Sequence, residues 1–313
     1  MTGRLLQMSG VVVDLIYDVD QVPRAGDEAI VTGFAIAPGG GFNAMVAARR
    51  GGMSVCYGGA IGTGPFAQIV ADGLNAEAIA CLRRPDPGRD QGCCTVMIDR
   101  AGERTFVASD GAEGHITETD LARIDFAAFD WTLLSGYALH YAGSRDTLTA
   151  WLRDGANVAR LVFDPSPIAA RLDRAALGSA LERAEWVSAN RQEAADLTGE
   201  TDAAAAAQAL ARGRSGGAVV RDGAAGCLVA TAEGCTRIAG FRVDAIDTNG
   251  AGDTHVGSFI AALHRGGDPL EAARQANAAA ALSTTKKGPA TAPMPEAVAR
   301  FLQDRQANLT AAG

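Results

Sequence analysis

Asp247-Thr-Asn-Gly-Ala-Gly-Asp253 is the most informative stretch of this sequence, and it runs directly into the helical pattern Thr254-His-Val-Gly-Ser-Phe-Ile-Ala-Ala-Leu263. Glycine at 250 and 252 lets backbone amides converge at the start of that helix, where unpaired N–H groups and the helix dipole favour a phosphate or a developing negative charge. Asp253 adds a carboxylate beside this anion hole. Phosphoryl transfer to an alcohol needs this combination, because the phosphoryl group must be held while the alcohol gives up a proton.

The rest of the chain has the rhythm of an α/β protein with a mainly parallel sheet, because apolar strand-like runs alternate with alanine-rich helical patterns. The expected central strands are residues 5–13, 54–61, 131–135, 160–164, 185–188 and 218–221. The expected helices are residues 43–50, 66–75, 144–158, 173–183, 202–212, 252–264, 268–283 and 295–306. The sequence has no internal repeat and no disordered linker, so we expect residues 1–313 to form a single domain.

Two regions interrupt the alternation of strands and helices. Residues 14–36 and 93–109 read as hairpin-like strands, and the second turns at Asp99-Arg-Ala-Gly-Glu103. We expect the two regions to form a small sheet that projects from the main domain. Such a sheet is a candidate lid over a substrate.

Composition favours a protein that acts on small molecules. The net charge of −8 leaves no basic excess for phosphates or anionic lipid, so we expect neither nucleic-acid nor membrane partners. No apolar run approaches 18 residues, and polar residues break the first ten residues, so no secretory signal is expected. The six cysteines form no Cys-x-x-Cys and read as reduced thiols. These features predict a cytoplasmic protein.

Several other catalytic classes lack their motifs. There is no Gly-Lys dipeptide for a Walker-type P-loop, no His-Glu-x-x-His and no Gly-x-Ser-x-Gly. Gly62-Thr-Gly-Pro-Phe-Ala67 fits Gly-x-Gly-x-x-Ala and keeps a nicotinamide dehydrogenase as an alternative, although it follows the second major strand and residues 82–86 lack a clean strand-end acid. His255 lies two residues after Asp253, on a different side of the helix, and is expected to be packed or solvent-facing.

Further segments stand in a fixed order around the 247–253 stretch. They are Pro38-Gly-Gly-Gly-Phe-Asn43, Asn190-Arg-Gln-Glu193, Asp222-Gly-Ala-Ala-Gly226 and the helical run 276–282. With Asp247–Asp253 they resemble the motifs of the ribokinase-like, or PfkB-type, carbohydrate kinases from about residue 5 to residue 300. The resemblance implies a three-layer α/β/α ribokinase-like domain with a small β-sheet lid. It also implies that ATP is the phosphoryl donor and that magnesium is required.

The resemblance also assigns roles at the reacting centre and at the substrate. Asp253 becomes the base, and the amides of Gly250, Ala251 and Gly252 become the anion hole. The groups implied to bind substrate hydroxyls are Asp14, Gly40, Gly41 and Asn43. Read without the resemblance, Asp14 is also compatible with a turn and Asn43 with a helix cap.

Other roles concern the nucleotide and the cations. The nucleotide-side residues implied are Asn190, Glu193, Arg221, Gly223, Gly226 and Asn277. Glu193 would hold magnesium through water, since magnesium needs only one or two protein oxygens. Asn190-x-x-Glu193 alone also fits a helix capping box. Asp247 and carbonyls around residues 283–288 lie near a potassium site in activated relatives, so potassium is a further candidate cofactor.

The sequence departs from the family pattern in ways that leave the substrate open. Pro38 takes the first place of a usual Gly-Gly pair, Gly64 stands where an acid is frequent, and Arg221 stands where Thr is frequent. We therefore expect a kinase for a small sugar or sugar acid, with a nucleoside kinase as the alternative. A catalytically inactive sugar or nucleoside sensor is less favoured, because it would not need the acid, the glycines and the Asn-x-x-Glu pair together. Several relatives dimerise through the lid, and the resemblance extends a homodimer to this chain.

Overall fold

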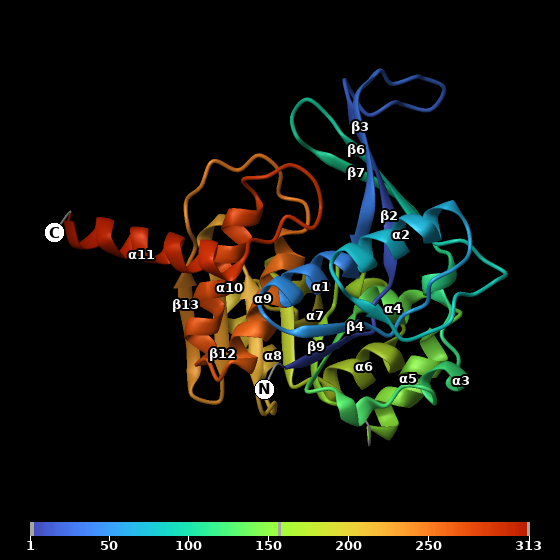
Figure 1. The fold of residues 1–313 in the computed structure, drawn as a ribbon. Coiled ribbons are helices and arrows are strands. Elements are labelled where there is room, and N and C mark those ends of the chain that lie inside the picture. The colour runs from blue at the N-terminus through green and yellow to red at the C-terminus, as the bar shows by residue number, and fades with distance from the viewer. Residues whose placement is uncertain (1–2, 156–157, 312–313) are drawn as a thin grey trace.

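A nine-stranded sheet forms the centre of the computed structural model, which describes residues 3–155 and 158–311 (Figure 1). Its order is β13-β12-β11-β10-β9-β8-β1-β4-β5, with parallel pairing from β11 to β5 and an antiparallel edge formed by β12 and β13. The strands are β1 (Arg4–Gln7), β4 (Ser54–Tyr57), β5 (Ala80–Cys81), β8 (Trp131–Ser135), β9 (Arg160–Asp164), β10 (Trp186–Asn190), β11 (Gly217–Arg221), β12 (Gly226–Thr231) and β13 (Gly234–Ala239).

Helices cover both faces of this sheet, because successive strand residues point to opposite sides. Val162 and Val219 join the core under one set of helices, while Phe163 and Val220 join the other core. The first set is α1 (Gly41–Arg50), α2 (Pro65–Ala76), α9 (Ala251–His264) and α10 (Pro269–Ser283). The second set is α3 (Glu118–Leu121), α4 (Gly136–His140), α5 (Arg145–Asp154), α6 (Arg174–Arg183), α7 (Arg191–Thr198) and α8 (Ala203–Ala211). The predicted three-layer architecture is confirmed, and the C-terminal helix α11 (Pro295–Ala311) extends from one side of it (Figure 1).

A separate small sheet projects from the main body (Figure 1). Its order is β3-β2-β6-β7, from β2 (Val11–Val19), β3 (Val31–Gly40), β6 (Cys93–Ile98) and β7 (Arg104–Ser109). The turn between β6 and β7 closes with the Asp99 amide donating to the Glu103 carbonyl at 3.1 Å, and Gly102 adopts φ 81°. The prediction of a small sheet from the two interrupting regions is therefore confirmed.

Three predicted elements are longer than the structure shows. The strand expected over 54–61 ends at Tyr57. The single strand expected over 5–13 is divided, because the Ser9 hydroxyl accepts a hydrogen bond from the Ser135 amide and the chain leaves the main sheet before Val11. The helix expected over 144–158 ends at Asp154, because Gly155 adopts the left-handed conformation that terminates helices; residues 156–157 lie outside the described part of the chain. The elements absent from the prediction are β5, the β12–β13 hairpin, α3, α4 and α7.

Helices α1 and α9 are in close contact, and this contact positions the functional site. Gly257 of α9 faces α1 so closely that an added Cβ would overlap the carbonyl oxygen of Ala44 and lie 2.8 Å from the Ala47 Cβ. Asn43 lies on α1 and Asp253 on α9. Because Gly257 has no side chain, α1 and α9 pack closely enough to bring Asn43 and Asp253 near each other.

Replacing Gly257 with alanine should lower the free energy of unfolding by about 1–3 kcal/mol, because the added methyl overpacks the helix contact. The matched control is Gly178→Ala in α6, where an added Cβ meets nothing within 4 Å. This control should raise stability by up to about 1 kcal/mol through helix propensity. Urea unfolding of both variants measures the difference. Equal stabilities would contradict the packing argument.

Candidate active site

A cleft of about 1390 Å³ runs along the carboxyl ends of the parallel strands. The last residues of four neighbouring strands line it: Ser135 of β8, Asp164 of β9, Asn190 of β10 and Arg221 of β11. Open α/β sheets bind ligands at this edge, because every parallel strand ends there and the helix N-termini that follow point toward it. The small sheet contributes Asp14 from β2 and Arg104 from β7 to the same cleft.

The N-terminus of α9 forms one wall of this cleft. Gly250 is the N-cap with φ 69°, a left-handed conformation that glycine adopts without strain, and no described side chain caps this helix. A Cβ at Gly250 would also lie 3.1 Å from the Asn43 amide. The first amides of a 14-residue helix therefore face the cleft without a side-chain acceptor.

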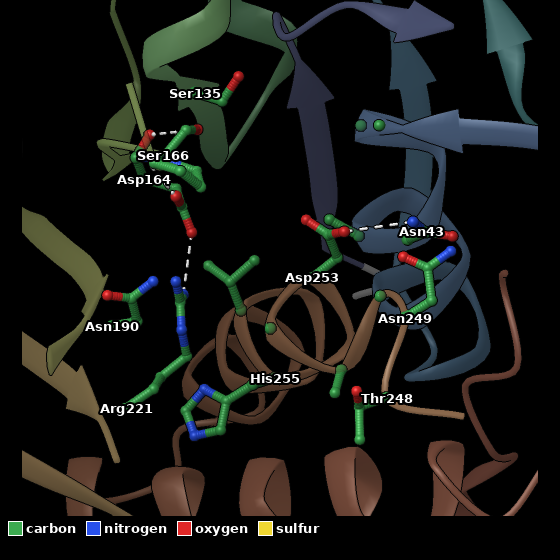
Figure 2. Close-up of a pocket in the computed structure, with 18 of the residues that line it drawn as sticks. Asn43, Ser135, Asp164, Ser166, Asn190, Arg221, Thr248, Asn249, Asp253 and His255 are labelled. Atoms are coloured by element: carbon green, nitrogen blue, oxygen red, sulfur yellow. Dashed lines mark hydrogen bonds and ion pairs between the residues drawn. The ribbon is translucent and has the colours of Figure 1, made fainter. Parts of the chain in front are cut away.

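Asp253 stands in the first turn of α9, beside these amides. Asn43 Nδ2 donates to Asp253 Oδ2 at 3.2 Å (Figure 2). Asn43 Oδ1 accepts from the Ala290 amide at 2.8 Å. Burial raises the pKa of Asp253 to about 7, with a further increase from the Asp164 carboxylate, while Asn43 and Arg221 oppose the rise. A carboxylate with this pKa is suited to accept a proton near neutral pH.

Arg221 joins two more acids at the base of the cleft. Its Nη1 donates to Asp164 Oδ2 at 2.9 Å (Figure 2). The same nitrogen donates to Ser188 Oγ at 2.7 Å, and Nη2 lies 3.4 Å from Glu193 Oε2. Burial and the neighbouring Asp164 raise the pKa of Glu193. Arg221 is thus a fixed positive charge shared between carboxylates rather than a free ligand.

Asn190 and Glu193 form a reciprocal capping box at the start of α7. Asn190 Oδ1 accepts from the Glu193 amide at 2.8 Å, while Glu193 accepts from the Asn190 amide and from Asn190 Nδ2, both at 2.7 Å. The sequence-based interpretation of Asn190-x-x-Glu193 as a helix capping box is therefore confirmed. Both residues nevertheless line the cleft, so the cap also fixes a carboxylate at its edge.

At the opposite end of the cleft, Asp14 of β2 is 7% exposed. Burial raises its pKa to about 6, and a side-chain hydrogen bond with Asn249 partly opposes the rise. Gly39 packs against this carboxylate so closely that an added Cβ would overlap it. Gly40 follows with φ 59°, and the Gly41 amide donates to the Gly10 carbonyl at 2.9 Å. The glycine run therefore lets β3 and α1 approach Asp14.

The residues predicted to contact the nucleotide differ in whether their polar groups are already hydrogen-bonded within the protein. Gly223 and Gly226 flank a short turn at the cleft with φ 55° and 97°. Asn277 is buried, and its Nδ2 donates to the carbonyls of Ile238 and Ala239 at 3.2 Å. Its Oδ1 lies 3.1 Å from His255 Nε2, and His255 is packed as expected, with burial lowering its pKa to about 3. Asn277 thus holds β13 and α9 together.

Asp247 does not fit the potassium site that the resemblance implies. Its Oδ1 accepts from Arg104 Nη2 at 2.5 Å and from the Asn249 amide at 2.9 Å. Its Oδ2 accepts from the Gly288 amide at 2.9 Å. Both oxygens already have protein donors, and one donor is a cation.

The Gly62–Ala67 segment also does not fit a dinucleotide site. Asp90 Oδ2 and Oδ1 accept from the amides of Phe66 and Ala67 at 3.2 and 2.8 Å. The N-terminus of α2 is therefore filled by a carboxylate of this chain, where a dehydrogenase would bind pyrophosphate.

Asp164, Ser166 and Arg104 line the cleft but are missing from the predicted site. Asp164 had a usable signal, since it is an acid at the end of an expected parallel strand. Ser166 adopts φ 61°, unusual for a residue other than glycine, and its amide donates to Asp164 Oδ1 at 3.0 Å. Nothing in the sequence around Arg104 indicated that it would reach the cleft.

Comparison with known proteins identifies the family. The model of the family described as pfkB family carbohydrate kinase matches residues 7–297. The chain belongs to this family. It is 30% identical to the ATP-dependent ribose-1-phosphate kinase of Halopiger xanaduensis, over 96% of this chain and 99% of that protein. It is 28% identical to the ribokinase of Haemophilus influenzae, over 92% and 94% of the two chains.

A solved structure supports the same fold. The ribokinase of Giardia lamblia superposes with a TM-score of 0.84 at 21% identity, covering 97% of this chain and 99% of that chain. The predicted family and ribokinase-like fold are thus confirmed. Within residues 3–155 and 158–311, no helix is long and apolar enough to cross a membrane.

Replacing Asp253 with asparagine should stabilise the protein at pH 8. The carboxyl has a higher pKa folded than unfolded, so the folded state binds more protons between about pH 4 and 7, and wild-type stability falls as pH rises through that window. The variant avoids this cost, so its free energy of unfolding should exceed wild type by roughly 1–3 kcal/mol at pH 8 and match it near pH 4.

Thermal and urea unfolding from pH 4 to pH 8 measure this difference. Asp146→Asn is the control, because that side chain is 95% exposed and should leave the wild-type pH dependence unchanged. A variant less stable than wild type at pH 8 would contradict the desolvation of Asp253.

Proposed function

We propose that this protein transfers the γ-phosphoryl group of ATP to a hydroxyl of a small sugar or sugar acid. The observation that carries the proposal is the desolvated Asp253 carboxylate beside the open amides of α9, between Asp14 and the Gly223–Gly226 turn. The relative from Halopiger xanaduensis, whose name states an ATP-dependent phosphorylation of a sugar derivative, supports the donor and the acceptor class.

In the proposed reaction, a substrate hydroxyl lies against Asp253 and its oxygen attacks the γ-phosphorus. The new O–P bond forms as the bond to the ADP oxygen breaks, the hydroxyl proton passes to Asp253, and ADP leaves. The amides of Gly250, Ala251 and Gly252 stabilise charge on the transferring group. Asn43 orients Asp253 through their hydrogen bond. Gly223 and Gly226 form the nucleotide side of the cleft.

Asp14, Gly40, Gly41 and Asn43 are proposed to bind the substrate. Asp14 is a buried acceptor at the base of the small sheet, and a carboxylate suits adjacent alcohols because its two oxygens accept two hydrogen bonds. Gly40 and Gly41 line the cleft at the same place. The small sheet then acts as the lid that covers the sugar and excludes water.

Magnesium fits the acidic end of the cleft. Burial, and then repulsion from Asp164, raise the pKa of both Glu193 and Asp253, so a nearby divalent cation would relieve an existing excess of negative charge. Asp164 and Glu193 are the carboxylates proposed to hold it, through water. Bound magnesium supplies charge neutralisation of the phosphates. Within residues 3–155 and 158–311, no group of three or more His, Cys, Asp or Glu side chains could hold a metal ion by itself.

A nucleoside acceptor is the second candidate, and the aromatic side chains at the rim favour it. Phe106 and Tyr137 line the cleft and are 58% and 41% exposed. Exposed rings can stack on a base, which a sugar does not require. The donor and the base Asp253 remain the same in this alternative.

The small sheet also supports a homodimer. It exposes large apolar side chains, which commonly mark protein contacts. They are Val31, Phe34, Ile36, Phe106 and Val107. Sedimentation velocity at several protein concentrations tests this assembly, and a monomer at every concentration would contradict it.

The direct experiment is ADP formation from ATP and magnesium against sugars, sugar acids, sugar phosphates and nucleosides. Turnover of a sugar or sugar acid supports the proposal, and turnover of nucleosides alone selects the alternative. Ligand binding without ADP formation across the whole panel would indicate a sensor and overturn the proposed kinase activity.

Asp253→Asn should lower kcat by roughly 10²–10⁴-fold, because it removes the proton acceptor but keeps size and hydrogen-bonding capacity. ATP affinity should stay close to wild type. Asp14→Asn is the matched control at the other end of the site: it should mainly raise KM for the sugar, if its contacts are equal in the ground and transition states. Steady-state kinetics on the substrate found above measure both. Near-normal kcat in Asp253→Asn would remove it as the base.

A further inference from the structure

An arginine of the small sheet contacts the loop that leads into the anion hole. Arg104 begins β7, and its guanidinium reaches Asp247 Oδ1 at 2.5 Å and Thr248 Oγ1 at 2.8 Å, across more than 140 residues of sequence. Thr248 and Asn249 are the residues directly before Gly250. Two hydrogen bonds from Arg104, to Asp247 and to Thr248, therefore link the small sheet to the backbone that precedes the first amides of α9.

Asp247 connects three segments through this contact. One carboxylate oxygen receives Arg104 and the Asn249 amide, and the other receives the Gly288 amide. The amides of Ile246 and Asp247 also donate to the Thr284 carbonyl at 2.7 and 3.0 Å. The loop of residues 246–250, which leads into the proposed anion hole, thus meets the loop of residues 284–288 and β7 at the Asp247 carboxylate. Arg104 supplies the positive charge beside that carboxylate.

We propose that Arg104 is a positioning residue that couples the small sheet to the anion hole, and that its guanidinium takes the role for which the family resemblance suggests potassium. The consequence is a kinase whose activity does not depend on a monovalent cation. A potassium ion beside Asp247 would lie next to the guanidinium and would be repelled by it. This inference rests on the proposed phosphoryl transfer.

A second ion pair links the same elements but is not equivalent. Lys287 Nζ lies 2.6 Å from Asp18 Oδ2 of β2, and the lysine side chain is 65% exposed. The side chains of Arg104 and Asp247 are only 21% and 9% exposed. Water and salt weaken the exposed pair far more, and the planar guanidinium also holds Thr248 in a fixed direction. Lys287 is therefore a matched control for removing a positive charge between the small sheet and this loop.

The test compares kcat in potassium chloride with kcat in tetramethylammonium chloride at equal ionic strength. Wild type and Lys287→Ala should give equal rates in the two salts. Arg104→Ala should lose roughly 10–100-fold in tetramethylammonium, because the anion hole is no longer held in place, and should recover part of the loss in potassium. Arg104→Lys keeps the positive charge but not the planar contact with Thr248, so it should lose less activity than Arg104→Ala and remain insensitive to the salt.

Thermal unfolding without substrates gives a second readout. The melting temperature of Arg104→Ala should be higher in potassium than in tetramethylammonium, whereas wild type should show no difference. Potassium activation of wild type, or an Arg104→Ala variant with wild-type kcat in both salts, would overturn the proposal. So would equal losses in the alanine and lysine variants with no salt effect on melting. If wild type phosphorylates nothing, the proposed function fails, and the melting comparison still tests Arg104.

Discussion

The site depends on an excess of buried negative charge at the carboxyl edge of the sheet. Asp164, Glu193 and Asp253 share Arg221 as their neighbouring cation, and burial raises the pKa of Asp253 to about 7. Such a cluster is costly in the protein alone. In the proposed reaction, this charge makes Asp253 a strong proton acceptor beside the amides of α9, and magnesium would neutralise part of the charge when the nucleotide binds. Stability is thus given up where the chemistry needs an unsatisfied carboxylate.

Three glycines let backbone segments approach closely, and these contacts fix the position of the acidic residues relative to Asp14 and Asn43. Gly257 lets α9 contact α1, Gly250 lets the anion-hole loop pass Asn43, and Gly39 lets β3 pass Asp14. The first two contacts join α9 and the loop before it to α1, and the third joins two strands of the small sheet beside Asp14. A movement of the small sheet would therefore change the position of Asp253 through few residue contacts. The most direct of these is the contact of Arg104 with Asp247, and Asn43 contacts Asp253 itself.

The contiguous part of this site could be predicted from the sequence. Residues 247–253 contain the glycines, the helix start and the acid within seven positions, so the local pattern predicts the local structure. Asp164 lies far away in sequence, and only the rule that parallel strands end at one edge could have indicated it. The contact of Arg104 with Asp247 depends on how the small sheet sits on the main domain, which tertiary packing sets. The division of the strand expected at 5–13 likewise depends on Ser9 meeting Ser135, a contact made across the fold.

The central claim is that Asp253 is a desolvated general base, and the pH dependence of kcat/KM for the sugar tests it most directly. Measured at fixed magnesium and ATP in buffers of constant ionic strength, kcat/KM should be level above about pH 7 and fall about tenfold per pH unit below it, because protonated Asp253 cannot accept the hydroxyl proton. A kcat/KM that stays level down to pH 5 would contradict the account, because a base with an ordinary carboxyl pKa, or no base, would then carry the reaction.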